Sequence, residues 1–245
     1  MHPSIPLWVT LIVIGTSFLV PVLGWLVFAR FARRSARKLV VPSALFIGVW
    51  LVLAFTLAAR GFFAGGEADV VPRIAYSVLP LVIGYLAYLT IPAVREVADE
   101  IPLHWMIGFQ LYRAVGFIFL VEWMLGALPG AFALPAGLGD MAIGLSAPLV
   151  ASLVRRGAPG ARGAAIVWNV LGIADLVVAV TLGFLTSPGP MHQSALGATN
   201  YAVTLMPLVL IPTIPVPFSM LAHLVDLHRL AVRPHRAALG FSRAA

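Results

Sequence analysis

Cysteine is absent from the 245 residues, which excludes disulfides, thiolate nucleophiles and cysteine metal sites. Charged residues are scarce as well. They make up 10% of the chain, whereas ordinary soluble domains carry about 25%. Hydrophobic residues account for 61%, so the chain lacks the polar side chains needed to cover a water-facing surface. This composition predicts an integral membrane protein.

Several functional motifs are missing. There is no phosphate-binding Walker A loop, and Ser146 lies in Gly144–Pro148, which does not match the Gly-x-Ser-x-Gly pattern of hydrolases. The one lysine is Lys38, in a loop, so no span offers an amine for a covalently bound retinal. The net charge of +7 comes from basic residues in short loops rather than from one solvated face, which argues against nucleic-acid binding. These absences favour a role other than catalysis and predict no cofactor.

Seven apolar runs approach or exceed the roughly 20 residues that a membrane helix needs. No polar block is long enough for a second domain. We therefore predict an all-α bundle of about seven transmembrane helices over residues 1–230, with a short basic tail over 231–245. The predicted spans are Leu7–Ala29, Leu39–Ala59, Ile74–Val94, Leu103–Leu128, Leu138–Val154, Ala164–Leu185 and Tyr201–Leu224.

The basic residues predict an orientation. If the loop after the first span is cytoplasmic, only Arg60 and Arg73 fall outside, Arg113 falls within the membrane, and the other thirteen of the sixteen lysines and arginines lie inside. Cytoplasmic loops carry such an excess of positive charge. We expect the N-terminus outside, the C-terminus inside, and a location in the inner (plasma) membrane. The plan resembles that of opsins in span count alone.

The fourth span carries polar residues deep in the membrane. Counting 1.5 Å per residue from the inner ends of spans four and six puts Gln110 and Asn169 at about 10 and 8 Å, and Arg113 and Asp175 at about 15 and 16 Å. Equal depth and opposite charge predict an Arg113–Asp175 ion pair, either as a structural link or as a pair that a proton or an anionic substrate opens.

The outer end of span four suggests a second pair. Glu122 lies about 28 Å in, and Asp140 starts the predicted fifth span at the same surface. Two neighbouring carboxylates cannot both ionise cheaply, so one of them would accept a proton or bind a cation. The alternatives are that both reach outer water, or that Asp140 caps a helix.

Four prolines interrupt the seventh span, and each removes a backbone donor. They are Pro207, Pro212, Pro215 and Pro217. We expect a kinked or discontinuous helix with free carbonyls near residues 210–214. This break is either packed against protein or forms a cation or substrate site.

Histidines gather towards the inner side. His104 opens span four and His223 closes span seven, so these two are candidates for holding a haem or a metal ion. Solvated interfacial histidines are the alternative explanation.

The layered polar residues and the broken helix favour a small permease or proton-coupled secondary transporter, with the polar path between spans four to seven. Its partners would be the lipid bilayer and a proton or an unidentified small solute, and it could form oligomers. Two alternatives remain open: a haem- or metal-binding redox protein, and a non-catalytic accessory or assembly subunit of a membrane complex.

Overall fold

The computed structural model describes residues 5–33, 36–65, 69 and 71–232. These residues form helices joined by short turns, and no strand occurs among them. The predicted tail over 231–245 lies outside the described residues, except for the last two residues of the final helix.

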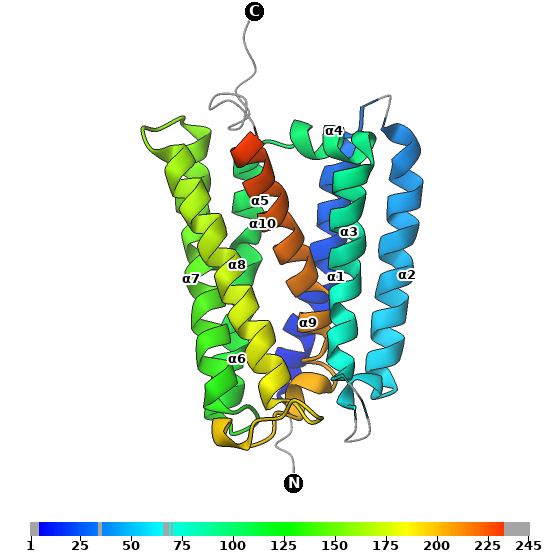
Figure 1. Cartoon of the computed structure of the whole chain (residues 1–245), viewed down its shortest axis with the longest axis vertical. Helices are drawn as coiled ribbons and strands as arrows, with labels where there is room; N and C mark the ends of the chain where they lie inside the picture. The colour runs from blue at the N-terminus through cyan, green and yellow to red at the C-terminus, as the bar shows by residue number, and fades with distance from the viewer. Residues whose placement is uncertain (1–4, 34–35, 66–68, 70, 233–245) are drawn as a thin grey trace, which may run out of the picture.

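Seven helical segments are long and apolar enough to cross a membrane, as the sequence predicts. They stand side by side (Figure 1). Large apolar side chains such as Leu11, Val52 and Leu149 remain exposed on the outer faces, as expected for a surface that contacts lipid. The segments are Leu7–Phe31, Arg37–Ala59, Arg73–Thr90, Leu103–Met124, Gly130–Arg155, Ala161–Thr186 and Leu210–Val232.

Three of the segments are single α-helices: α1 (Leu7–Phe31), α7 (Gly130–Arg155) and α8 (Ala161–Thr186). The second and third begin with 3-10 turns, η1 (Arg37–Leu39) before α2 (Val40–Ala59) and η3 (Arg73–Val78) before α3 (Leu79–Thr90). A short helix, α4 (Pro92–Glu100), follows α3 across one end of the bundle (Figure 1).

The fourth span is composite. It consists of α5 (Leu103–Phe109), a 3-10 segment η4 (Gln110–Gly116) and α6 (Phe117–Met124). A 3-10 stretch in the middle of a helix often marks a hinge or local strain. This stretch carries Arg113.

The fifth span begins at Gly130, eight residues before the predicted Leu138. The turn is confined to the residues before Pro129, where Gly126 has a left-handed φ of 76°. Gly137 and Gly139 belong to the helix. They serve close packing, since a Cβ on Gly137 would lie 2.8 Å from Leu120 Cδ2. We had interpreted these glycines as turn residues, and that interpretation was wrong.

The seventh span also differs from the prediction. The regular helix starts later and ends later, as α9 (Leu210–Thr213) followed by α10 (Pro215–Val232). The segment before it folds into turns and a 3-10 stretch whose apolar side chains, including Val203 and Leu208, are buried. This irregular backbone therefore lies against protein, as it must at membrane depth.

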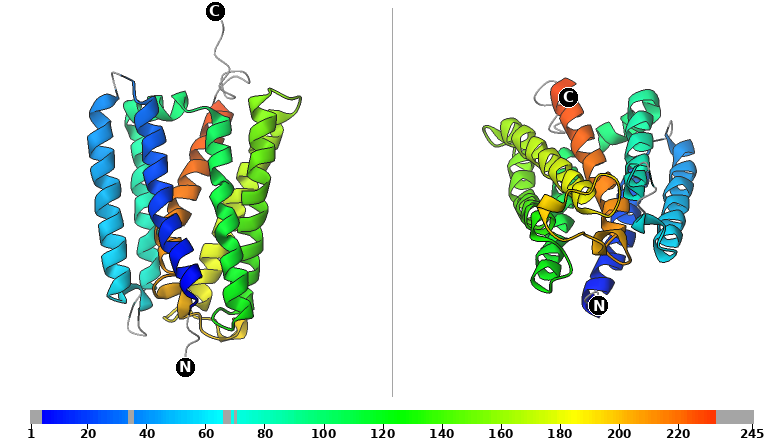
Figure 2. Two further views of the ribbon diagram at one scale, coloured as in Figure 1. Left: turned by 180° about the vertical axis from the view of Figure 1, so that it is seen from behind. Right: turned by 60° about the horizontal axis from the view of Figure 1, so that its bottom comes forward.

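Helix α10 lies at the centre of the bundle and contacts α1, α3, α5 and α8. Figure 2 shows it passing between α1 and α5 in the left view. One face of α10 carries buried polar residues at helical spacing, and that face turns towards spans four and six. These residues are Ser219, His223, Asp226 and Arg229.

Candidate functional site

The site is built around Arg113, whose residue is 3% exposed. The 3-10 segment η4 brings its backbone very close to α7: a Cβ on Gly144 would lie 2.4 Å from the Ala114 nitrogen. A glycine at 144 is therefore needed for this approach. The short distance between the two backbones lets the arginine reach partners on three other helices.

The guanidinium binds two carboxylates and a histidine. Nε donates to Asp140 Oδ1 at 2.8 Å, Nη2 donates to Asp175 Oδ2, and Nη1 lies 2.9 Å from His223 Nε2. The partners come from α7, α8 and α10. The Arg113–Asp175 pair that depth and charge predicted is confirmed.

Asp140 does not pair with Glu122 at the outer surface, so that prediction was wrong. Because α7 begins at Gly130, Asp140 lies ten residues into the helix rather than at its start, which brings it level with Arg113. Glu122 is buried separately on α6, and its Oε1 has no hydrogen-bond partner among the described residues.

Hydrogen bonding fixes the tautomer of His223. Arginine only donates, so Nε2 must accept from Arg113 and be unprotonated. Nδ1 then carries the proton and donates to Asn169 Oδ1 at 2.7 Å. The Asn169 amide in turn donates to the Ala165 carbonyl at 2.9 Å. The imidazole is therefore neutral, with both ring nitrogens engaged.

Gln110 and Asn169 do not form the expected amide pair. Gln110 instead makes two bonds to Ser219 on α10: its Nε2 donates to the Ser219 carbonyl at 3.3 Å, and its Oε1 accepts from Ser219 Oγ at 3.0 Å. The Tyr112 hydroxyl also contacts Ser219 Oγ. Both amides thus attach to α10 or its histidine, because α10 lies between spans four and six.

Three glycines make room for the charged group. A Cβ on Gly139 would lie 1.6 Å from Asp175 Oδ1, and one on Gly116 would lie 2.4 Å from Asp140 Cβ. Gly172 faces the His223 ring in the same way, at 2.4 Å. Each partner of Arg113 therefore sits against the bare backbone of a neighbouring helix. We call these four residues, Arg113, Asp140, Asp175 and His223, the Arg113 cluster.

The Arg113 cluster has unequal charges. One guanidinium faces two carboxylates, and His223 is neutral, so the cluster carries a net charge of −1 when both aspartates are ionised. An unbalanced charge inside a bilayer costs several kcal/mol. One bound proton would remove the imbalance.

Two small cavities adjoin Asp140. One has a volume of about 30 Å³ and is also lined by Ser17, Arg113 and Ser219. The other, of about 40 Å³, is otherwise mostly apolar. A cavity of about 10–15 Å³ holds one water molecule if polar partners are present. Ser17 Oγ is buried without a hydrogen-bond partner among the described residues, so the first cavity has such a group on its wall.

The proline break is a packed kink. Pro217 cannot donate to the Thr213 carbonyl, and the Trp50 indole donates to it instead at 2.9 Å. The Pro215 carbonyl accepts from the Tyr112 hydroxyl at 3.2 Å. Pro207 lies before the helix and Pro212 within α9. Side chains of the bundle thus satisfy these two carbonyls.

The histidines do not form the proposed metal or haem site. Both His223 nitrogens are engaged within the Arg113 cluster. His104 lies in the first turn of α5, nine residues and therefore about 14 Å along the span from Arg113. No group of three or more His, Asp or Glu side chains suited to a metal occurs in the part of the chain that the structure describes.

Sequence reasoning missed part of the site. Ser219 and Tyr112 were not selected, and Arg229 was counted as a loop residue although it is buried and donates to the Ile101 carbonyl at 2.9 Å. The spacing of the polar residues on α10, at steps of four, three and three, was the available signal. It was overlooked because the span was expected to end at Leu224.

The chain belongs to the family described as "Domain of unknown function (DUF8737)", which matches residues 70–231. The matched segment covers the last five spans and contains every residue of the Arg113 cluster. Searches of curated proteins and of solved structures found no match.

Proposed function

We propose that this protein is a small proton-coupled secondary transporter of the inner (plasma) membrane, with its N-terminus outside and its C-terminus inside. The observation that carries the proposal is the Arg113 cluster: one guanidinium shared by two carboxylates from different helices, buried in the middle of a span. Such intramembrane charges are costly and commonly mark proton or substrate pathways.

A proton would act on the cluster through its charge. When a proton binds Asp140, the attraction between this carboxyl and Arg113 weakens, and the guanidinium is left with Asp175 as its charged partner. Because Asp140 lies on α7 and Asp175 on α8, protonation changes which helices are held to span four. The 3-10 segment η4 is the part of span four that would adjust.

The polar path runs past the cluster on both sides. Gln110, Asn169 and Ser219 lie beside it, and the two small cavities at Asp140 give water access to the carboxyl from within the bundle. The solute would be small, and its coupling to the proton would follow from competition for Arg113 if it carries an anionic group.

Proton flux in liposomes tests the proposal. The purified full chain is reconstituted with a pH-sensitive dye inside, and a membrane potential drives protons inwards. Asp140→Asn and Asp175→Asn should each lower the flux at least tenfold, because an amide cannot exchange the proton. Asp69→Asn, at the surface ion pair with Arg73, is the matched control and should leave the flux unchanged. Equal flux in all four proteins would reject the proposal.

A non-catalytic accessory role is the second candidate. The observation that favours it is the complete hydrogen bonding of Arg113 and His223, which also suits a purely structural junction of four helices. Under this role the reconstituted wild-type protein carries no protons above the level of empty liposomes, although Arg113 remains necessary for stability.

A further inference from the structure

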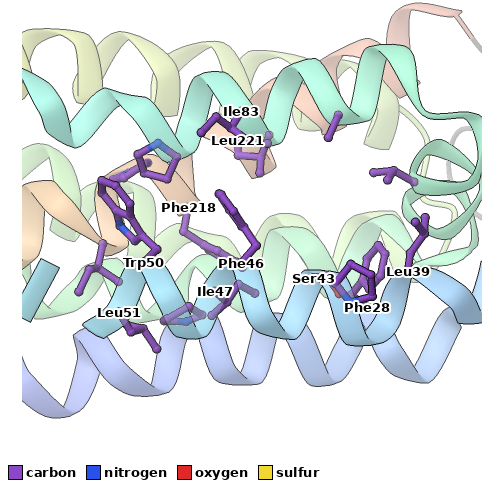
Figure 3. Close-up of a pocket in the computed structure, with 18 of the residues that line it drawn as sticks. Phe28, Leu39, Ser43, Phe46, Ile47, Trp50, Leu51, Ile83, Phe218 and Leu221 are labelled. Carbon is purple, nitrogen blue, oxygen red and sulfur yellow. The ribbon is translucent and has the colours of Figure 1, made fainter. Parts of the chain in front are cut away.

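The largest apolar cavity described lies far from the Arg113 cluster. Its volume is about 410 Å³, and it lies between α2 and α3, with α1 beside it and α10 as its floor. Figure 3 shows side chains from these helices pointing into the space, with Trp50 towards one end and Leu39 and Phe28 towards the other. The volume falls within the range of ligand pockets, about 300–1,000 Å³.

The wall offers an occupant almost nothing but hydrocarbon. Ser43 and Trp50 are the two of its nineteen lining residues whose side chains carry a polar atom. Both are already bonded to backbone carbonyls, Ser43 Oγ to Val40 and Trp50 Nε1 to Thr213, each at 2.9 Å. A ligand here gains no side-chain hydrogen bond, so it must be apolar.

The floor of the cavity is held in position by close packing. A Cβ on Gly24 would lie 2.2 Å from Phe218 Cζ, and one on Gly84 would lie 2.8 Å from Leu221 Cδ2. Phe218 and Leu221 are therefore seated on bare backbone, which keeps them low in the floor. Larger residues at these glycines would push both side chains into the cavity.

The dimensions of the cavity match one leaflet. Its lining along the second span runs from Leu39 to Leu51, about 18 Å at 1.5 Å per residue. Half of a hydrocarbon core of about 30 Å is about 15 Å. A chain that enters at the Leu39 end therefore reaches the middle of the membrane.

The Leu39 end is basic. Arg37 and Lys38, both exposed, directly precede Leu39, and exposed Arg95 directly follows the lining residue Val94. Among acidic residues at this end, Glu100 is paired with Arg33 at 2.6 Å, and Glu96 neighbours Arg95. Arg37 and Lys38 thus place positive charge where a lipid headgroup would lie.

We infer that this cavity binds one acyl chain of an anionic phospholipid, whose phosphate lies against Arg37 and Lys38. The lipid fills the space between α2 and α3 and so connects the first two spans to the rest of the bundle. The matched family segment starts after α2, so the bound lipid would join this segment to a pair of helices outside it. This inference does not depend on proton transport.

Native mass spectrometry of the full chain in detergent tests the inference, with phosphatidylglycerol and phosphatidylcholine titrated as probes. The wild type should retain one phosphatidylglycerol at least tenfold more tightly than phosphatidylcholine. Ala87→Phe, which fills the cavity from α3, should abolish retention of both lipids. Val82→Phe, on the same helix but exposed and outside the lining, is the matched control and should retain them.

The headgroup contact has its own variant. Arg37→Gln with Lys38→Gln should remove the preference for phosphatidylglycerol while phosphatidylcholine is held as before, and Arg60→Gln, at the other end of α2, should change neither. Equal retention by the Ala87 and Val82 variants would overturn the inference. So would a lipid-free dimer, since a helix of a second copy would then occupy the cavity.

Discussion

Replacing Arg113 with methionine should destabilise the protein through the charges it leaves behind. The substitution removes three hydrogen bonds and leaves Asp140 and Asp175 facing each other without a cation. Removing one partner of a buried ion pair costs about 3–5 kcal/mol. For a chain of this size each kcal/mol shifts the melting temperature by about 2–4 °C, so a fall of about 6–20 °C is expected.

A neutral cluster should recover most of this loss. In the triple variant with Arg113→Met, Asp140→Asn and Asp175→Asn no charge remains buried, and buried ion groups can often be replaced by uncharged residues at little cost. Replacing only Arg113 and Asp175 would not suffice, because Asp140 would stay unpaired. We expect the triple variant to regain at least half of the lost melting temperature.

Thermal unfolding of the purified proteins in one detergent, followed by tryptophan fluorescence, measures both effects. The refuting results are clear: a single Arg113→Met variant that melts with the wild type, or a triple variant no more stable than the single one. Either would mean that buried charge does not hold these helices together.

Two further substitutions test packing. Gly139→Ala places a Cβ 1.6 Å from Asp175 Oδ1 and should lower both the melting temperature and the proton flux. Gly48→Ala, in open space on α2, should leave both unchanged or raise stability slightly, and equal behaviour of the two variants would contradict the assigned role of Gly139. Trp50→Phe leaves the Thr213 carbonyl without its indole donor and should cost about 1–3 kcal/mol in denaturant unfolding. An unchanged unfolding midpoint would show that this carbonyl finds another partner.

The sequence predicted the parts of the fold that depend on the solvent. Apolar length gave seven spans, and the price of burying charge gave the Arg113–Asp175 pair. Neither inference needs to know how helices pack. Helix boundaries failed where packing decides them, as at Gly137 and Gly139, because a glycine at a turn and a glycine at a tight helix contact look alike in a sequence.

The site was predicted only as far as depth along a helix could be counted. Asp140 was misplaced by the late start assigned to its span, and the error then gave it the wrong partner. Rotation about a helix axis was not counted at all, so the polar face of α10 went unnoticed. The 3-10 geometry around Arg113 has no local signal that we can identify, since it arises from the approach of Gly144.

The position of α10 bears on how the protein assembles. The chain is made from its N-terminus, so the helix at the middle of the bundle is the last to leave the ribosome. Until it arrives, the earlier spans surround a vacant centre, and Arg113 has only its two aspartates to neutralise it. The final helix then delivers His223 and Ser219 together, closing the structure from within as synthesis ends.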